Sequence, residues 1–148
     1  MDLYHPRVIE LAAEIPHVGR LAAPQGSSTK VSRVCGSVVT VDLDLDGDKI
    51  ANLGVDVQAC ALGQAAASVF ARNAIGATIE EVRAARDALY AMIKQGAPPP
   101  QGRFWELRHL EGVKDYPPRH ASTMLAFEAA VEAIERAQAA SRAPAKQV

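Results

Sequence analysis

Apolar and polar residues alternate along two stretches in the first half of the chain, residues 39–45 and 53–57. A period of two is typical of a β-strand with one buried and one solvated face. Asp46–Gly47, between the two stretches, has the composition of a hairpin turn. A further strand around residues 29–34 would complete a three-stranded antiparallel sheet, which we expect for this half of the chain.

Elsewhere the apolar residues recur at helical intervals. Gly76 has the position of a helix C-terminal stop, and Thr78 with Glu81 forms a capping box that starts the next helix. The expected helices cover residues 3–15, 61–75, 78–94 and 104–113, with a last helix that includes residues 124–136. Strands followed by helices is the order of an α+β domain in which helices pack on one face of an antiparallel sheet.

The composition is that of one globular domain. The chain has 148 residues, of which 49% are hydrophobic and 22% charged. We expect residues 1–140 to form a single domain, with a short helix at its N-terminus. Residues 141–148 are small, polar and charged, so a frayed tail is expected there.

The charge balance argues against a polyanionic partner. Sixteen basic and seventeen acidic side chains leave a net charge of −1, so no excess of cations could hold nucleic acid. Asp2 and Glu10 interrupt the N-terminal apolar residues, unlike a secretory signal, and no stretch approaches the roughly 18 apolar residues of a membrane span. The sequence therefore predicts a cytoplasmic protein with neither nucleic acid nor membrane as partner.

Asp42, Asp44 and Asp46–Gly47 repeat the opening of a calcium-binding EF-hand loop. However, Lys49 replaces the apolar residue of such a loop, and Leu53 replaces its bidentate glutamate. We interpret the aspartates instead as residues on the outward face and in the turn of the hairpin, where they keep its surface solvated.

Only two cysteines occur, Cys35 and Cys60, too few for a disulfide scaffold. Cys35 stands at a junction between strands, where Gly36 permits a bend. Cys60 stands where the third strand ends and a helix begins, and free amides and the helix dipole there favour the thiolate. If the strands are neighbours, both thiols project from the same end of the sheet, where a metal or sulfur species could bridge them. Alternatively, both are small buried apolar residues, and two ligands are fewer than the four of a typical zinc site.

Four segments together resemble, in order, the motifs of the NifU/IscU-type iron–sulfur cluster assembly scaffolds. They are Val34–Ser37, Leu45–Ile50, Ala59–Ser68 and Tyr116–Ala126. The resemblance implies a three-stranded antiparallel sheet with helices packed on it. It also implies a site in which three cysteines and an acidic residue hold a nascent [2Fe–2S] cluster or a zinc ion, or accept persulfide sulfur from a cysteine desulfurase.

The match is partial at the positions that carry this function. Cys35 and Cys60 match the first two cysteines of the family, whereas Ser37 stands in place of its aspartate and Ser122 in place of its third cysteine. His120 could turn inward as a third metal ligand, or it could only cap the last helix. Tyr116–Pro118 keeps the two prolines of a segment that an Hsp70-type chaperone recognises in some members, without the neighbouring residues.

The leading hypothesis is a scaffold or carrier, not an enzyme, that binds a [2Fe–2S] cluster or iron through Cys35 and Cys60 beside Ser122. The missing ligands would come from His120, from glutathione or from a second subunit, which predicts a homodimer bridged by the cluster. Its partners would be a cysteine desulfurase and recipient apoproteins. The alternatives are a persulfide relay, for which a reactive thiol at Cys60 would be suited, and a regulatory partner of the desulfurase.

Overall fold

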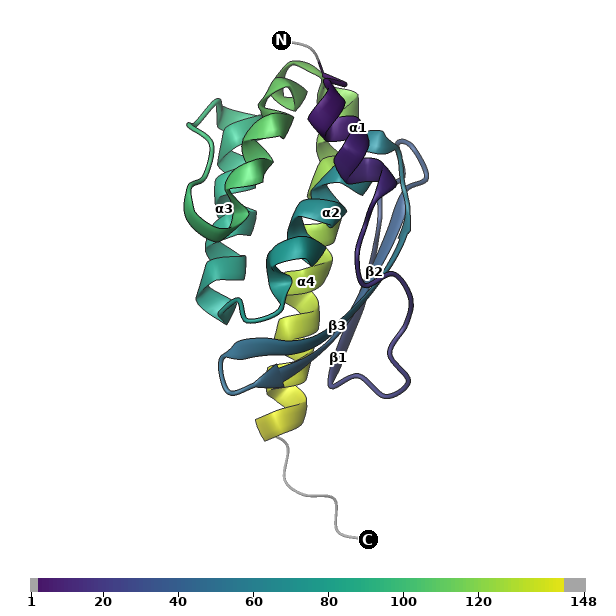
Figure 1. Cartoon of the computed structure of the whole chain (residues 1–148), viewed down its shortest axis with the longest axis vertical. Helices are drawn as coiled ribbons and strands as arrows, with labels where there is room; N and C mark the ends of the chain where they lie inside the picture. The colour runs from purple at the N-terminus through teal and green to yellow at the C-terminus, as the bar shows by residue number, and fades with distance from the viewer. Residues whose placement is uncertain (1–2, 143–148) are drawn as a thin grey trace, which may run out of the picture.

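The computed structural model describes residues 3–142 and contains a three-stranded antiparallel sheet in the order β1-β2-β3 (Figure 1). The strands are β1 (Gly26–Val31), β2 (Val38–Asp46) and β3 (Lys49–Gln58). Val31 pairs with Val38, which pairs in turn with Gln58, so these three residues form the last row at one end of the sheet. The predicted fold class, an α+β domain with such a sheet, is confirmed.

The first strand lies three residues earlier than expected, at 26–31 instead of 29–34. The reason is a tight turn over residues 32–37. The Ser32 amide donates to the Ser37 carbonyl at 2.8 Å, and the Gly36 amide donates to the Ser32 carbonyl at 2.8 Å. Gly36 has a φ of +73°, in the left-handed region that glycine tolerates best.

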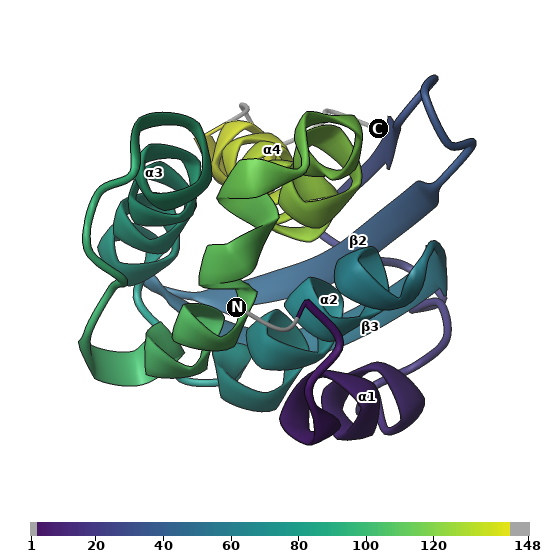
Figure 2. The same cartoon turned by 90° about the horizontal axis from the view of Figure 1, so that it is seen from above.

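The helices form two layers on the sheet (Figures 1 and 2). In the inner layer, α4 (His120–Arg142) packs against β1 and β2, and α2 (Ala61–Ala74) packs against β3. In the outer layer, α3 (Ile79–Gln95) contacts α4 and the 3-10 segment η1 (Gly102–Asp115). Helix α1 (Pro6–Ala13) lies along α2, and a short 3-10 turn, η2 (Pro117–Arg119), leads into α4.

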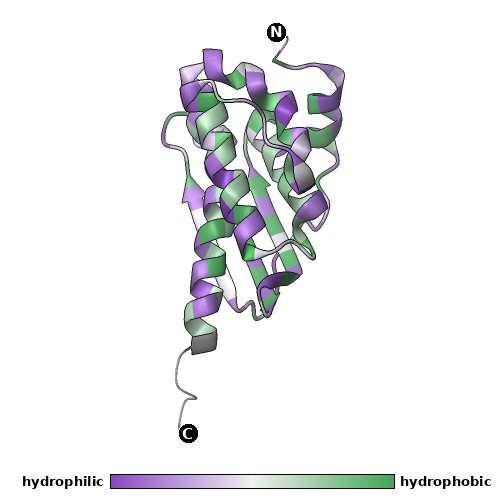
Figure 3. Ribbon diagram, turned by 90° about the vertical axis from the view of Figure 1, so that its left-hand side faces the viewer, coloured by the Kyte–Doolittle hydropathy of each residue, from purple (hydrophilic) through white to green (hydrophobic). Residues whose placement is uncertain are grey.

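Two local patterns explain how these elements start and pack. Green and purple bands alternate along the strands in Figure 3, as expected for a sheet with one face toward the helices. The predicted capping box is present, because the Glu81 amide donates to Thr78 Oγ1 at 3.0 Å and the Thr78 amide donates to Glu81 Oε1 at 2.9 Å. Phe70, Phe104 and Phe127 contact one another in the core, with ring centroids 5.4–6.3 Å apart.

The sequence predicted a solvated outer face for β2, but part of this face is buried. Asp42 is fully buried, and its carboxylate accepts from Arg20 Nε at 2.7 Å, from the Leu21 amide at 3.1 Å and from Ser27 Oγ at 2.6 Å. The chain before β1 crosses this face and forms a parallel bridge from Val18 to Val55. Asp42 therefore anchors a covering segment, and the calcium-like spacing of the aspartates has a structural explanation.

The sequence also predicted a frayed C-terminal tail and no membrane-spanning segment. Helix α4 is described through residue 142, and the expected frayed tail, residues 141–148, lies almost wholly outside the described residues, so it stays a prediction. Within the described range 3–142, no helix is long and apolar enough to cross a membrane.

Candidate functional site

Three segments that are distant in sequence meet at the end of the sheet marked by Val31, Val38 and Gln58. Cys35 lies in the turn between β1 and β2, and Cys60 is the N-cap residue of α2. Ser122 is the third residue of α4. In Figure 1 the β1–β2 turn and the start of α2 lie near the upper end of the sheet.

Hydroxyl groups lie beside both thiols, and Ser122 influences both of them. Ser122 Oγ is 3.4 Å from Cys60 Sγ, and Ser37 Oγ is 3.0 Å from Cys35 Sγ. The Cys35 thiol also donates to Ser32 Oγ at 3.6 Å. The three serines are buried, whereas Cys35 is exposed and Cys60 is half-buried. We call Cys35, Cys60, Ser32, Ser37 and Ser122 the thiol–hydroxyl cluster.

A glycine permits the close approach of α2 and α4 that forms this cluster. A Cβ atom on Gly63 would lie 2.9 Å from the Ser122 carbonyl oxygen and 2.9 Å from the Ala59 Cβ. Side chains do not tolerate such distances to backbone atoms, so the position requires glycine. The Gly63 position therefore lets the start of α4 bring Ser122 beside Cys60.

The hydroxyls make Cys35 unusually acidic. The pKa of the Cys35 thiol is lowered to about 7, chiefly by its hydrogen bond with Ser37, and also by Ser32 and Ser122; partial burial opposes the shift. With a pKa of about 7, roughly half of the thiol is ionised at neutral pH. The sequence contains a signal for this lowered pKa, because Ser32 and Ser37 stand three residues before and two residues after Cys35. The sequence had instead predicted Cys60, at the start of a helix, as the reactive thiol.

His120 lies at the start of α4 but is not part of the thiol–hydroxyl cluster. Its side chain is buried, and its Nε2 atom donates to the carbonyl oxygens of Val113 at 2.9 Å and Lys114 at 3.1 Å. That nitrogen holds the end of η1 against α4 and is not directed at a metal. Ligation by His120 would have to use the other ring nitrogen, Nδ1, and it stays a prediction.

The cluster provides two sulfur ligands and several hydroxyls. Among residues 3–142, no three His, Cys, Asp or Glu side chains come together in a way that could hold a metal ion. Two thiolates bind soft metals well, but structural zinc typically takes four ligands and a [2Fe–2S] cluster also takes four. The described residues of one chain therefore supply half of a closed site.

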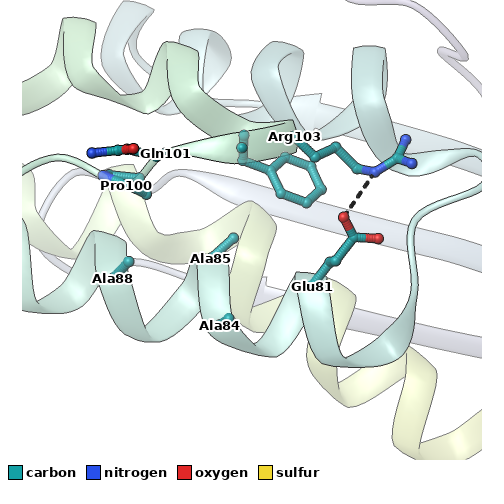
Figure 4. Close-up of a pocket in the computed structure, with 9 residues that line it drawn as sticks. Glu81, Ala84, Ala85, Ala88, Pro100, Gln101 and Arg103 are labelled. Atoms are coloured by element: carbon teal, nitrogen blue, oxygen red, sulfur yellow. Dashed lines mark hydrogen bonds and ion pairs between the residues drawn. The ribbon is translucent and has the colours of Figure 1, made fainter.

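A separate hollow of about 330 Å³ lies between α3 and residues 100–104 (Figure 4). Ala84, Ala85 and Ala88 line one side, and Phe104 lines the other. The ion pair between Arg103 and Glu81, at 3.3 Å, lies at its edge. This hollow shares no residue with the thiol–hydroxyl cluster and contains no soft metal ligand.

Similarity to known proteins covers almost the whole chain. The crystal structure of a nitrogen-fixing NifU-like protein (N-terminal) from Brucella abortus is 45% identical, with a TM-score of 0.91 over 95% of this chain and 96% of that one. A structure described as an iron–sulfur cluster assembly scaffold for the SUF system, from Fervidobacterium islandicum AW-1, covers 86% of this chain and 93% of that one. With a TM-score of 0.79 and 22% identity, it shows the fold alone.

A curated relative is the iron–sulfur cluster assembly scaffold protein IscU of Streptococcus pyogenes serotype M1. It is 31% identical over 102 residues, which is 69% of this chain and 64% of that protein, so the match spans less than two thirds of the relative. The family model described as NifU-like N terminal domain matches residues 3–139. The resemblance drawn from the four motifs is confirmed, and the chain belongs to the family of NifU-like N-terminal domains.

Proposed function

We propose that this protein is a scaffold in iron–sulfur cluster assembly, which binds iron and sulfide at Cys35 and Cys60 as a nascent [2Fe–2S] cluster and delivers it to recipient apoproteins. The observation that carries the proposal is the thiol–hydroxyl cluster, in which the Ser122 hydroxyl lies beside Cys60 and also helps to lower the pKa of Cys35. The name of the Streptococcus pyogenes relative and the family membership support the same function.

The chemistry of the thiol–hydroxyl cluster is suited to binding iron and sulfide. Thiolates are the usual ligands of iron–sulfur clusters, and about half of Cys35 is ionised at neutral pH because its pKa is about 7. Zinc could occupy the same thiolates, since it also favours sulfur ligands. The iron–sulfur cluster is cargo that the protein receives and transfers, so the protein acts as a scaffold and not as an enzyme.

The missing ligands come from a second copy of the chain in this proposal. Each copy offers two thiols, so two copies complete the four ligands of a [2Fe–2S] cluster. Two apolar side chains beside Cys35 are exposed, Val31 by 56% and Val34 by 71%. A cluster-bridged homodimer would bury these valines. The open alternatives are His120 and a small thiol such as glutathione.

A sulfur relay is the second candidate, and the exposed, acidic Cys35 favours it. In a relay, the Cys35 thiolate attacks the outer sulfur of a desulfurase persulfide. A new S–S bond forms at Cys35, and the desulfurase thiolate leaves with the electron pair of the broken S–S bond. This reaction needs no iron. A third candidate, a purely regulatory partner of a cysteine desulfurase, would require neither thiol.

Analysis of iron, zinc and acid-labile sulfide in protein purified without oxygen separates these candidates. The wild type would be compared with Cys35→Ser and Cys60→Ser, and with Ile75→Ser as a matched control at the far end of α2. A scaffold contains iron and sulfide in near-equal amounts in the wild type and control, and both cysteine variants lose them. Metal contents no higher than in the cysteine variants would overturn the proposal.

Mass spectrometry after incubation with a cysteine desulfurase and cysteine then distinguishes the other two candidates. A relay gains one sulfur atom at a single cysteine. A regulatory partner gains no sulfur but still binds the desulfurase when both cysteines are replaced.

A further inference from the structure

The first turn of α1 is attached to η1 by an ion pair. Arg7 donates from Nε to Glu106 Oε2 at 2.7 Å and from Nη2 to Glu106 Oε1 at 3.0 Å. The Glu106 side chain is only 14% exposed. The next residue, Val8, and Leu11, one turn along the helix, are completely buried. The position of α1 therefore depends on the groups around Arg7 as well as on apolar contacts.

His5 caps α1 in a way that depends on its protonation. It is the N-cap residue, and its Nδ1 atom accepts a hydrogen bond from the Arg7 amide at 3.2 Å. An imidazole nitrogen accepts a hydrogen bond only when it carries no proton. A protonated His5 therefore cannot provide this cap. Histidine side chains change protonation between pH 5 and pH 8 more readily than any other unperturbed side chain.

His109 lies against His5, so two protonated rings would be two adjacent cations. The two rings meet edge to face, with centroids 5.1 Å apart. The pKa of His109 is lowered, first by burial and then by His5, Arg7 and Arg108, while Glu106 acts in the opposite direction. Glu106, whose carboxylate lies 3.5 Å from His109 Nε2, is already paired with Arg7 through both oxygens.

The charges around the two rings do not compensate for two added protons. The charged side chains that interact with His109 or line the same hollow as the two rings are Arg7 of α1 and Glu106, Arg108 and Glu111 of η1. Glu10 and Glu14 interact with Arg7, and Arg72 of α2 interacts with Glu106. With both imidazoles protonated, cations outnumber carboxylates in this group. A hollow of about 580 Å³ lined by His5, His109 and Pro99 gives solvent access to both rings.

We infer that His5 and His109 form a pH-sensitive latch, which holds the first turn of α1 on η1 at neutral pH and releases it when both rings are protonated. Protonation removes the helix cap at His5 and places two cations side by side next to Arg7. Because the cap requires an unprotonated His5 Nδ1 and two adjacent cations repel each other, the protonated form favours the opened state, and acidification shifts the balance toward opening. The latch does not involve Cys35 or Cys60, so it is independent of the proposed function.

Hydrogen exchange of the metal-free, full-length protein tests this inference. Exchange of the peptide covering α1 is corrected for the intrinsic effect of pH and compared with a peptide from β2 as internal reference. Between pH 7.5 and pH 5.5 we expect the protection of α1 relative to β2 to fall about tenfold, the effect of losing one helix N-cap. A constant ratio in the wild type would overturn the latch.

The matched variant is the double substitution His5→Asn with His109→Phe. Asparagine keeps an N-cap acceptor that does not titrate, and phenylalanine preserves the ring packing. We expect its α1 protection to change less than twofold over the same pH range, and a fall equal to that of the wild type would overturn the latch. If this variant does not fold, an NMR titration of the wild type decides. The imidazole midpoints must coincide with the loss of the α1 amide signals, and separate midpoints would refute the inference.

Discussion

The Ser37 hydroxyl, 3.0 Å from the Cys35 sulfur, is the largest single cause of the lowered pKa of that thiol. Replacing Ser37 with alanine should raise the pKa from about 7 toward the ordinary value of a cysteine, roughly 8.5. At pH 7 the thiolate fraction then falls about tenfold. The check is the pH dependence of Cys35 alkylation by iodoacetamide, measured in a Cys60→Ala background.

Ser37→Thr is the control for this prediction, because threonine keeps a hydroxyl at the same position. Its alkylation midpoint should stay near that of the wild type. An unchanged midpoint in Ser37→Ala would show that the other hydroxyls are sufficient.

Ser122 occupies the position where the family motif has its third cysteine. Since Ser122 Oγ lies 3.4 Å from Cys60 Sγ, a thiol in its place would lie beside the sulfur of Cys60, one of the two proposed ligands. Ser122→Cys should therefore increase the iron and sulfide retained after anaerobic gel filtration, as measured by elemental analysis. Thr123→Cys, one residue along the same helix, is the matched control, and equal retention in both variants would contradict the prediction.

The site residues could be identified from the sequence only in part. Cys35, Cys60 and Ser122 were named from motif order, and the structure brings all three together. The role of Ser37 as a hydrogen-bond partner of Cys35 was missed, because it depends on side-chain directions within the turn over residues 32–37. The position of His120 was also left open, since its carbonyl partners in η1 become neighbours only through tertiary packing.

At the scale of elements, the Asp42 carboxylate fastens the segment before β1 to the outer face of β2. Asp42→Ala removes a buried acceptor and leaves the Leu21 amide and the Ser27 hydroxyl without their partner. We expect a loss of about 1–3 kcal/mol in the free energy of unfolding, measured by urea denaturation of the metal-free protein. Asp44→Ala, near the exposed hairpin end, should change stability much less, and equal losses would contradict this assignment.

The same carboxylate contributes a pH dependence. Burial raises the pKa of Asp42, but hydrogen bonds from Arg20, Ser27 and the Leu21 amide outweigh burial, and the net shift is downward. A lowered pKa means that this stability is present above the unfolded-state pKa of an aspartate and is lost as the pH falls through the folded-state value. Acid titration should therefore destabilise the wild type more than Asp42→Asn.

The elements whose limits depend on local sequence were predicted well. The capping box at Thr78 and the hairpin around Asp46–Gly47 rely on neighbours within a few residues, and both are present. The burial of Asp42 could not be predicted, because its cover comes from Arg20 and Leu21, about twenty residues away. Alternation alone indicates which residues face outward, not what covers them.

At the scale of the whole molecule, the proposed cluster-bridged dimer depends on a surface beside the site. Val34 is 71% exposed and adjoins Cys35. An aspartate at this position would carry a charge into the interface between two copies, where desolvation is costly. Val34→Asp should therefore weaken the dimer of the cluster-loaded protein at least tenfold without unfolding the chain, as measured by anaerobic sedimentation velocity.

Val18→Asp is the matched control, because Val18 is equally exposed, at 70%, but lies beside Val55 on the edge of β3. Metal-free protein should sediment as a monomer in all three forms, since each copy alone supplies only two thiols and no cluster joins them. Loaded wild type and Val18→Asp should sediment as dimers. A loaded wild type that sediments as a monomer would mean that one chain completes the ligand set, and attention would then turn to His120 or to an added small thiol.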